Sequence, residues 1–154
     1  KRAMKAVIAL GSNLENRRLN LDIAITKLEE LLGDLTVSPY FETKPVGGPA
    51  QDDFINAVVI ANSKLPADQL LKELLAIEDE MGRVRDVHWG PRIIDLDLIV
   101  HGDQVIDTVF LKLPHPLAAS REFVLEPWLS IDPDGEIPGK GSIKSLLASI
   151  QSAS

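Results

Sequence analysis

A chain of 154 residues, 45% of them hydrophobic and 25% charged, has the size and composition of one globular domain over residues 1–154. The absence of cysteine excludes disulfides and thiolate metal sites, so we expect a cytoplasmic protein. A net charge of −7 argues against a general nucleic-acid surface, and no apolar run reaches the roughly 18 residues of a membrane span, so neither partner is expected.

Short apolar runs bounded by turn residues predict strands, and apolar residues at helical spacing predict helices. In chain order, the elements predicted in the first half are a strand at Met4–Leu10, a helix at Asn16–Leu32, a strand at Thr36–Thr43 and a strand at Phe54–Asn62. Pro39 indicates an edge strand or a bulge within the second strand, because proline donates no hydrogen bond to a sheet. The Gly- and Pro-rich stretch 44–53 predicts a loop of a length that is usually functional.

In the second half, the predicted elements are a helix at Pro66–Met81, a strand at Ile93–Val100, a helical turn at Leu117–Arg121 and a C-terminal helix at Ile143–Ile150. The apolar segment Phe123–Ile131 is compatible with either a strand or a helix. The order β-α-β-β-α-β predicts an α+β, ferredoxin-like core, in which a mainly antiparallel sheet carries helices on one face. The C-terminal additions are then expected to cover part of the other face.

The strand at Ile93–Val100 holds two acidic residues in an otherwise apolar run. Strand alternation places one set on the core face, Ile94, Leu96, Leu98 and Val100, and the other set opposite, Ile93, Asp95, Asp97 and Ile99. Asp95 and Asp97 are therefore roughly 7 Å apart at Cα on one face. Two such carboxylates repel each other unless a cation intervenes, and Mg2+ favours carboxylates together with substrate phosphates. The pattern predicts a metal–phosphate platform; the alternative is a solvated sheet face with two incidental acids.

Three arginines precede this strand, and a histidine follows it. Arg83, Arg85 and Arg92 are suited to bidentate phosphate binding, although pairing with surface acids is the alternative for any one of them. His115, held between two prolines, is a candidate hydrogen-bond donor to phosphate or a structural residue. A P-loop is not present, because Gly139-Lys140-Gly141-Ser142 lacks the required spacing.

The strand at Phe54–Asn62 carries a candidate binding site for a flat heterocycle. Phe54 and Asn56 share a face, where a ring can stack on the phenyl group and an amide can bind the polar edge of the ring. Core packing is the alternative for Phe54. Asn56 interrupts an otherwise apolar strand, and a buried amide must find partners.

The motif Trp-Gly-Pro-Arg-x-x-Asp-Leu-Asp-Leu-Ile at 89–99 resembles the signature of the hydroxymethyl-dihydropterin pyrophosphokinase family of folate biosynthesis. Further matching motifs occur in the right order: Gly11-Ser12-Asn13-Leu14, Phe54-x-Asn56-Ala57, Glu78-x4-Arg83-x-Arg85, Pro114-His115 and Arg121-x-Phe123. The resemblance implies a ferredoxin-like enzyme that transfers the β,γ-diphosphate of ATP to the hydroxymethyl group of 6-hydroxymethyl-7,8-dihydropterin and releases AMP. It also implies two Mg2+ ions and possible fusion or association with other folate-pathway enzymes.

The resemblance further implies roles for individual residues. Asp95 and Asp97 hold the metals, and Arg83 and Arg92 grip the transferred phosphates. The residues implied at the pterin site are Thr43, Pro45, Val46, Phe54, Asn56, Trp89 and Phe123. Those implied at the ATP site are Glu78, Arg85, Trp89, Arg92, Leu98, His115 and Arg121. The chain departs from the family pattern at Phe110, Lys112 and Pro116.

Two other functions are compatible with the same residues. One is a metal-dependent nucleotidyl transferase or phosphohydrolase on the same fold. The other is a non-catalytic sensor of a small molecule, which leaves the arginines and the aspartate pair without a purpose.

Overall fold

The structure is a computed structural model that describes residues 3–14, 16–44, 53–82 and 93–153. In chain order its elements are β1 (Met4–Ser12), α1 (Arg17–Leu32), β2 (Leu35–Val37), β3 (Phe41–Thr43), β4 (Phe54–Ser63), α2 (Ala67–Gly82), β5 (Asp95–His101), β6 (Ile106–Asp107), β7 (Lys112–Leu113), a 3-10 turn (Ala118–Ser120), α3 (Glu122–Ile131), β8 (Glu136–Ile137), β9 (Gly141–Ser142) and α4 (Ile143–Ala153).

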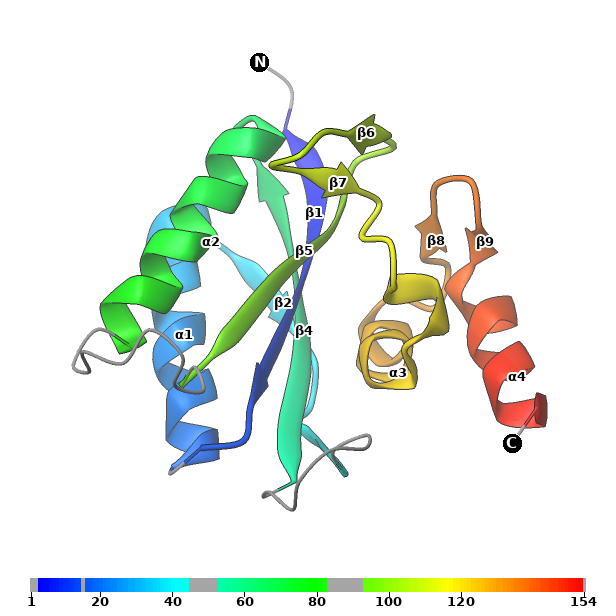
Figure 1. Ribbon diagram of the computed structural model, residues 1–154, viewed down its shortest axis with the longest axis horizontal. Coiled ribbons are helices and arrows are strands. Elements are labelled where there is room, and N and C mark those ends of the chain that lie inside the picture. The colour runs from blue at the N-terminus through cyan, green and yellow to red at the C-terminus, as the bar shows by residue number, and fades with distance from the viewer. Residues whose placement is uncertain (1–2, 15, 45–52, 83–92, 154) are drawn as a thin grey trace.

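The main sheet has the strand order β2-β4-β1-β5, and β3 also pairs with β4 (Figure 1). β4 is antiparallel to both β1 and β2, so these two run in the same direction with β4 inserted between them. β5 is antiparallel to β1 on its other side. This arrangement is the split βαβ unit, and it confirms the predicted ferredoxin-like α+β fold.

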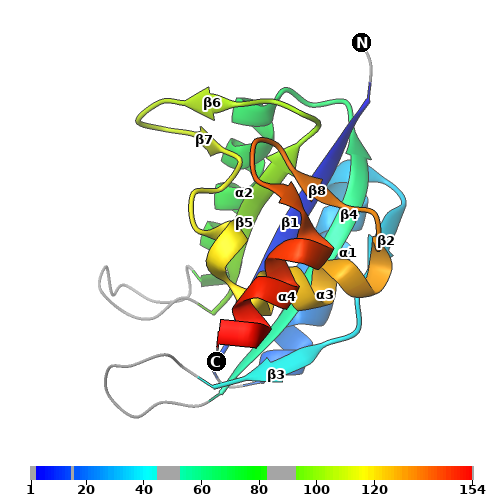
Figure 2. The ribbon, with the colours of Figure 1, turned by 90° about the vertical axis from the view of Figure 1, so that its right-hand side faces the viewer.

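Helices cover both faces of the sheet (Figures 1 and 2). On one face, Leu21 of α1 and Leu70 of α2 belong to a core cluster that also contains Ile8 of β1; we refer to it as the α1–α2 core. On the other face, Trp128 of α3 and Ile143 of α4 pack in a second cluster, the α3–α4 core. The C-terminal third of the chain therefore covers part of the second face, as expected.

Three predicted elements take a different form in the structure. The predicted strand Thr36–Thr43 is divided into β2 and β3, and Pro39, which has no N–H for the ladder, lies in the interruption. The ambiguous segment Phe123–Ile131 is helical, with Trp128 completely buried and its indole N–H donating to Asp132 Oδ2 over 2.9 Å. The helix α2 ends at Gly82, one residue beyond its predicted end.

The alternation predicted for β5 holds only as far as Leu98. In the pairing with β1, Ile8 is opposite Leu98 but the preceding residue, Val7, is opposite Val100. Ile99 therefore has no partner in β1 and forms a β-bulge. A bulge of this kind moves every later side chain to the other face. Ile94, Leu96 and Leu98 lie in the α1–α2 core as predicted, but Val100 joins Ile99 in the α3–α4 core. The predicted facing of Val100 was therefore wrong.

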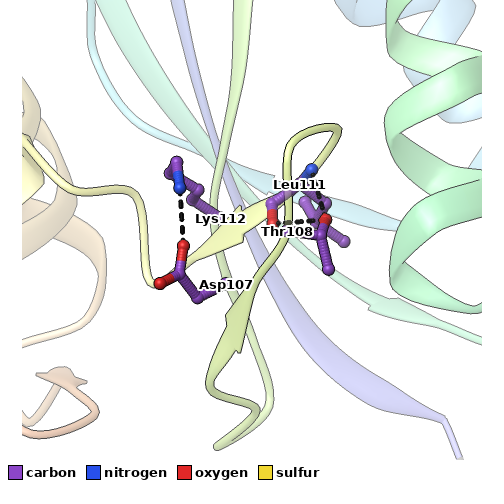
Figure 3. A network of polar contacts seen from close by, with 4 residues as sticks. All are labelled: Asp107, Thr108, Leu111 and Lys112. Carbon is purple, nitrogen blue, oxygen red and sulfur yellow. Dashed lines mark hydrogen bonds and ion pairs between the residues drawn. The ribbon is translucent and has the colours of Figure 1, made fainter.

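A short hairpin formed by β6 and β7 follows β5 (Figure 3). The Thr108 hydroxyl donates to the carbonyl of Leu111 over 3.0 Å, and the N–H of Leu111 donates back over 2.9 Å. Lys112 forms an ion pair with Asp107, and this contact lowers the pKa of the Asp107 carboxyl. Phe110 lies 47% exposed near the hairpin turn. Within the described residues, no helix has the length and apolar character of a membrane span.

Candidate active site

A cavity of about 920 Å³ opens on the face of the sheet that carries α3 and α4. Its walls combine residues from the sheet and from the C-terminal third of the chain. They are Ala9, Leu10, Gly11, Thr43, Lys44, Phe54, Asn56, Asp95, Asp97, Ser120, Arg121, Glu122, Phe123, Glu126 and Ile150. The cavity brings together all four described residues that the family resemblance places at the pterin site, and both of those it places at the metal site.

The wall nearest β4 is suited to a flat polar ring. Phe54 and Asn56 both line the cavity, as their shared face predicted, and Phe123 reaches it from α3. Asn56 is 4% exposed, and its side-chain amide donates to the hydroxyl of Thr43 over 2.6 Å. The expectation that a buried amide on this strand must find a partner is confirmed, and the partner holds the amide group in place.

The two aspartates lie on the other side of the same cavity. Strand β1 separates them from Asn56, because Gly11 pairs with Asn56 in β4 and with Asp95 in β5. Adjacent strands are roughly 4.8 Å apart, so the backbones at Asn56 and Asp95 are separated by roughly 10 Å. A heterocycle bound beside Asn56 can therefore extend a short substituent toward the aspartates.

The donor set suits magnesium rather than a metal that needs a full protein cage. Asp95 and Asp97 line the cavity from alternate positions of one strand, with the Leu96 side chain directed to the opposite core. The described residues contain no group of three or more His, Cys, Asp or Glu side chains placed to hold a metal. Two carboxylates complemented by phosphate oxygens and water match the usual coordination of Mg2+.

Arg121 and His115 are two described basic residues close to Asp97, and Lys44 also lines the cavity. Arg121 lines the cavity, and its guanidinium lies 5.4 Å from the centroid of the Phe123 ring. Burial lowers the pKa of His115 below its ordinary value, whereas the Asp97 carboxylate acts in the opposite direction and Arg121 lowers it further. The N–H of Leu117 donates to His115 Nδ1 over 3.2 Å, so a neutral His115 carries its proton on Nε2 and can donate from there.

Three described residues implied at the nucleotide site, Glu78, Leu98 and His115, are not among those that line the cavity. Leu98 is 4% exposed and its side chain lies in the α1–α2 core, so a contact with a nucleotide would come from its backbone. Glu78 of α2 is 8% exposed and its Oε2 accepts a hydrogen bond from the N–H of Leu96 over 2.7 Å. The remaining predicted site residues, Pro45, Val46, Arg83, Arg85, Trp89 and Arg92, lie outside the described residues.

Sequence reasoning missed several residues of the cavity wall. Glu122 and Glu126 line it from one side of α3, four positions apart. That spacing marks a single helix face, but the signal is usable only once the segment is known to be helical. The departures Phe110 and Lys112 are not part of the wall: Phe110 lies beneath the ammonium of Lys72, which is 6.0 Å from its centroid, and Lys112 pairs with Asp107.

Comparison with known proteins identifies relatives of this arrangement. Residues 7–133 match the family model described as 7,8-dihydro-6-hydroxymethylpterin-pyrophosphokinase. The 2-amino-4-hydroxy-6-hydroxymethyldihydropteridine pyrophosphokinase of Pseudomonas aeruginosa is 39% identical over 146 residues, which cover 94% of this chain and 90% of the relative. The enzyme of the same name from Aquifex aeolicus is 39% identical over 127 residues, covering 82% of this chain and 79% of the relative.

Longer proteins also contain a similar unit. The folic acid synthesis protein fol1 of Pneumocystis carinii is 41% identical over 145 residues, which cover 93% of this chain and 20% of that protein. Among solved structures, an HPPK-DHPS protein in complex with substrates is similar with a TM-score of 0.76 at 13% identity, over 99% of this chain and 44% of that one. The chain thus spans less than half the length of that structural relative, and the likeness concerns the fold.

Proposed function

The chain belongs to the 7,8-dihydro-6-hydroxymethylpterin-pyrophosphokinase family, and we propose that its cavity binds ATP and Mg2+ together with the pterin. Membership gives the reaction as pyrophosphoryl transfer to hydroxymethyldihydropterin in folate biosynthesis. The donor, the metal and the roles of individual residues are the proposed part. The observation that supports them is the single cavity that unites Phe54, Asn56 and Phe123 with Asp95 and Asp97.

In the proposed reaction, the hydroxymethyl oxygen of the pterin attacks the β-phosphorus of ATP in line. The new bond joins that oxygen to the β-phosphorus, and the bond from the β-phosphorus to the oxygen bridging to the α-phosphorus breaks. AMP leaves with the bridging oxygen, and the hydroxyl proton is released to solvent. Positioning and charge neutralisation supply most of the catalysis in phosphoryl transfer, so no strong general base is required.

The residues divide between the two substrates. Phe54 and Phe123 bind the two faces of the pterin, Asn56 binds its polar edge, and Thr43 holds the Asn56 amide in place. Pro45, Val46 and Trp89 complete the pterin site. Two Mg2+ ions held by Asp95 and Asp97 would neutralise the phosphate charge. Arg83 and Arg92 bind the transferred phosphates, and the ATP site is completed by Arg85, Trp89, Leu98, His115 and Arg121. Glu78 acts on this site indirectly, by accepting a hydrogen bond from the N–H of Leu96.

We further propose that residues 1–154 act as one pyrophosphokinase domain in the cytoplasm. The protein fol1 and the HPPK-DHPS protein carry similar units within longer chains. These relatives support a fusion or an association of this domain with other folate-pathway enzymes.

One assay tests the proposed reaction against its rivals. The protein is incubated with ATP, Mg2+ and 6-hydroxymethyl-7,8-dihydropterin, and the products are separated by chromatography. We expect AMP and pterin diphosphate in equal amounts, and no product when Mg2+ is chelated. A pterin carrying AMP would indicate a nucleotidyl transferase, and orthophosphate a phosphohydrolase. Binding without turnover and without a Mg2+ requirement would indicate a sensor.

Gly11 is expected to be required for pterin affinity. A Cβ at this position would lie 3.0 Å from Asn56 Oδ1, so Gly11→Ala must displace the amide that binds the pterin edge. Losing one well-aligned hydrogen bond costs about 1 kcal/mol, so we expect about fivefold weaker pterin binding in calorimetry. Gly82→Ala is the matched control, because a Cβ there meets nothing within 4 Å. Unchanged affinity in Gly11→Ala would contradict the role of Asn56.

A further inference from the structure

Strand β5 bears both proposed metal ligands although it lies at the end of the sheet. Among the described strands of the main sheet, β1 is its one neighbour. A strand at an edge lacks the second ladder of hydrogen bonds that holds a central strand. The mutual repulsion of Asp95 and Asp97 also acts to separate the two side chains before a cation binds. The geometry of the metal site therefore depends on what else holds this strand.

Two side chains hold the backbone close to the aspartates, one within β5 and one just before it. The Glu78 carboxylate, presented by α2, accepts a hydrogen bond from the N–H of Leu96 over 2.7 Å. The Ser12 hydroxyl, at the end of β1, donates to the carbonyl of Ile93 over 2.7 Å. Asn20 of α1 in turn donates to the Ser12 hydroxyl over 3.1 Å. Ser12 is completely buried and Glu78 is 8% exposed, so both contacts are shielded from water.

The position of the Glu78 contact is the important feature. Leu96 lies between Asp95 and Asp97, with its side chain in the α1–α2 core while both aspartates line the cavity. The φ and ψ angles of Leu96 set the orientation of Asp95 relative to Asp97, so a backbone rotation at Leu96 would turn the two carboxylates relative to each other. A carboxylate acceptor makes one of the stronger hydrogen bonds to a backbone N–H. Glu78 thus restrains the two ligands from the opposite face of the sheet.

We propose that Glu78, assisted by Ser12, is a positioning residue that presets Asp95 and Asp97 for a divalent cation. This inference rests on the proposed metal role of the two aspartates. It assigns to Glu78 a function that needs an acceptor oxygen but not a negative charge. A direct electrostatic role at the nucleotide would need the negative charge. Glu78→Gln would then be as damaging as Glu78→Ala, whereas a positioning role tolerates Glu78→Gln.

The test compares Glu78→Ala with Glu78→Gln, whose amide oxygen still accepts from Leu96. The first readout is amide hydrogen exchange of Leu96 by NMR in the free protein. The second is the Mg2+ concentration at half-saturation for binding a non-hydrolysable ATP analogue. Loss of an outer-shell partner typically lowers metal affinity 10- to 100-fold. We expect Glu78→Ala to speed Leu96 exchange and raise the Mg2+ requirement about tenfold, and Glu78→Gln to stay within about twofold of wild type.

Ser12→Ala provides a second variant, expected to raise the Mg2+ requirement about threefold. Ser63→Ala is its control: Ser63 is also buried and its hydroxyl accepts from the N–H of Leu65, but it lies at the other end of the paired strands. We expect a wild-type Mg2+ requirement in Ser63→Ala. The proposal is overturned if Glu78→Gln is as impaired as Glu78→Ala, or if Glu78→Ala leaves the Mg2+ requirement unchanged. Should Glu78→Ala not fold, a wild-type Mg2+ requirement in Ser12→Ala would overturn it.

Failure of the proposed function gives a different result. If the aspartates do not bind the metal, Asp97→Ala keeps the wild-type Mg2+ dependence of analogue binding. Leu96 exchange still reports the Glu78 contact in that case, because it is measured without metal. The experiments therefore distinguish a failure of the metal role of the aspartates from a failure of the positioning role of Glu78.

Discussion

Replacing Asp97 with alanine is expected to lower kcat by at least about a thousandfold, or roughly 4 kcal/mol of transition-state stabilisation. Asp97 lines the cavity and is one of the two described carboxylates proposed to bind Mg2+. Its loss leaves the phosphate charge poorly neutralised, and pterin affinity in the presence of ATP should fall as well. The fold should persist, because the side chain belongs to the cavity wall rather than to either core. Release of AMP at saturating substrate measures the effect.

Asp107→Ala is the control for this variant. Asp107 is an exposed aspartate in β6, outside the cavity wall, and its side chain pairs with Lys112. We expect its kcat to remain within about twofold of wild type. The melting temperature of Asp97→Ala should match that of the wild type, which separates lost chemistry from lost structure. Wild-type turnover in Asp97→Ala would refute the metal assignment.

Alternation along a strand correctly predicted which polar and aromatic side chains share the cavity. The period of two placed Phe54 with Asn56 and placed Asp95 with Asp97, and each pair does line the cavity. The intervening residues Ile55, Ala57 and Val59 point to the other face and lie in the α1–α2 core. These local patterns succeed because one buried face determines the register of a strand.

Patterns failed where the decisive contact is distant in sequence. The bulge at Ile99 arises from the pairing of β5 with β1, and nothing in the run Leu98-Ile99-Val100 signals it. The helical state of the segment that begins at Phe123 depends on burying Trp128 against the sheet, and Pro127 weakens the local helical signal. The contact of Glu78 with Leu96 joins residues 18 apart and depends on how α2 packs on β5.

The central strand β1 explains how two distant motifs form one site. Gly11 pairs with Asn56 on one side and with Asp95 on the other, and Ala9 pairs with Asp97. Both β1 residues are small and line the cavity, so they leave the space above the sheet open. A larger residue at either position would narrow the passage between the heterocycle and the aspartates. Gly11 thus leaves the space above the sheet open, and the neighbouring Ser12 holds the backbone at Ile93, two residues before Asp95.

Replacing Phe123 with alanine is expected to weaken pterin binding roughly tenfold to hundredfold. Phe123 lines the cavity from α3, facing the sheet that carries Phe54, so it provides the second wall for a stacked ring. Stacking on an aromatic side chain contributes about 1–3 kcal/mol for a nucleobase-sized ring. Affinity for an ATP analogue should change less than about threefold, because the nucleotide is assigned to other residues. Calorimetric titration with each ligand measures both values.

Phe110→Ala is the matched control for the loss of a phenyl ring. Phe110 is 47% exposed near the β6–β7 turn and is not part of the cavity wall, so we expect both affinities to stay at wild-type values. Because Phe123 also packs against the α3–α4 core, part of its effect could arise from a displaced helix. A displaced α3 would also move Arg121, which immediately precedes it, and would weaken both ligands together. Equal losses of pterin and nucleotide affinity would therefore contradict stacking, whereas a selective loss of pterin affinity supports it.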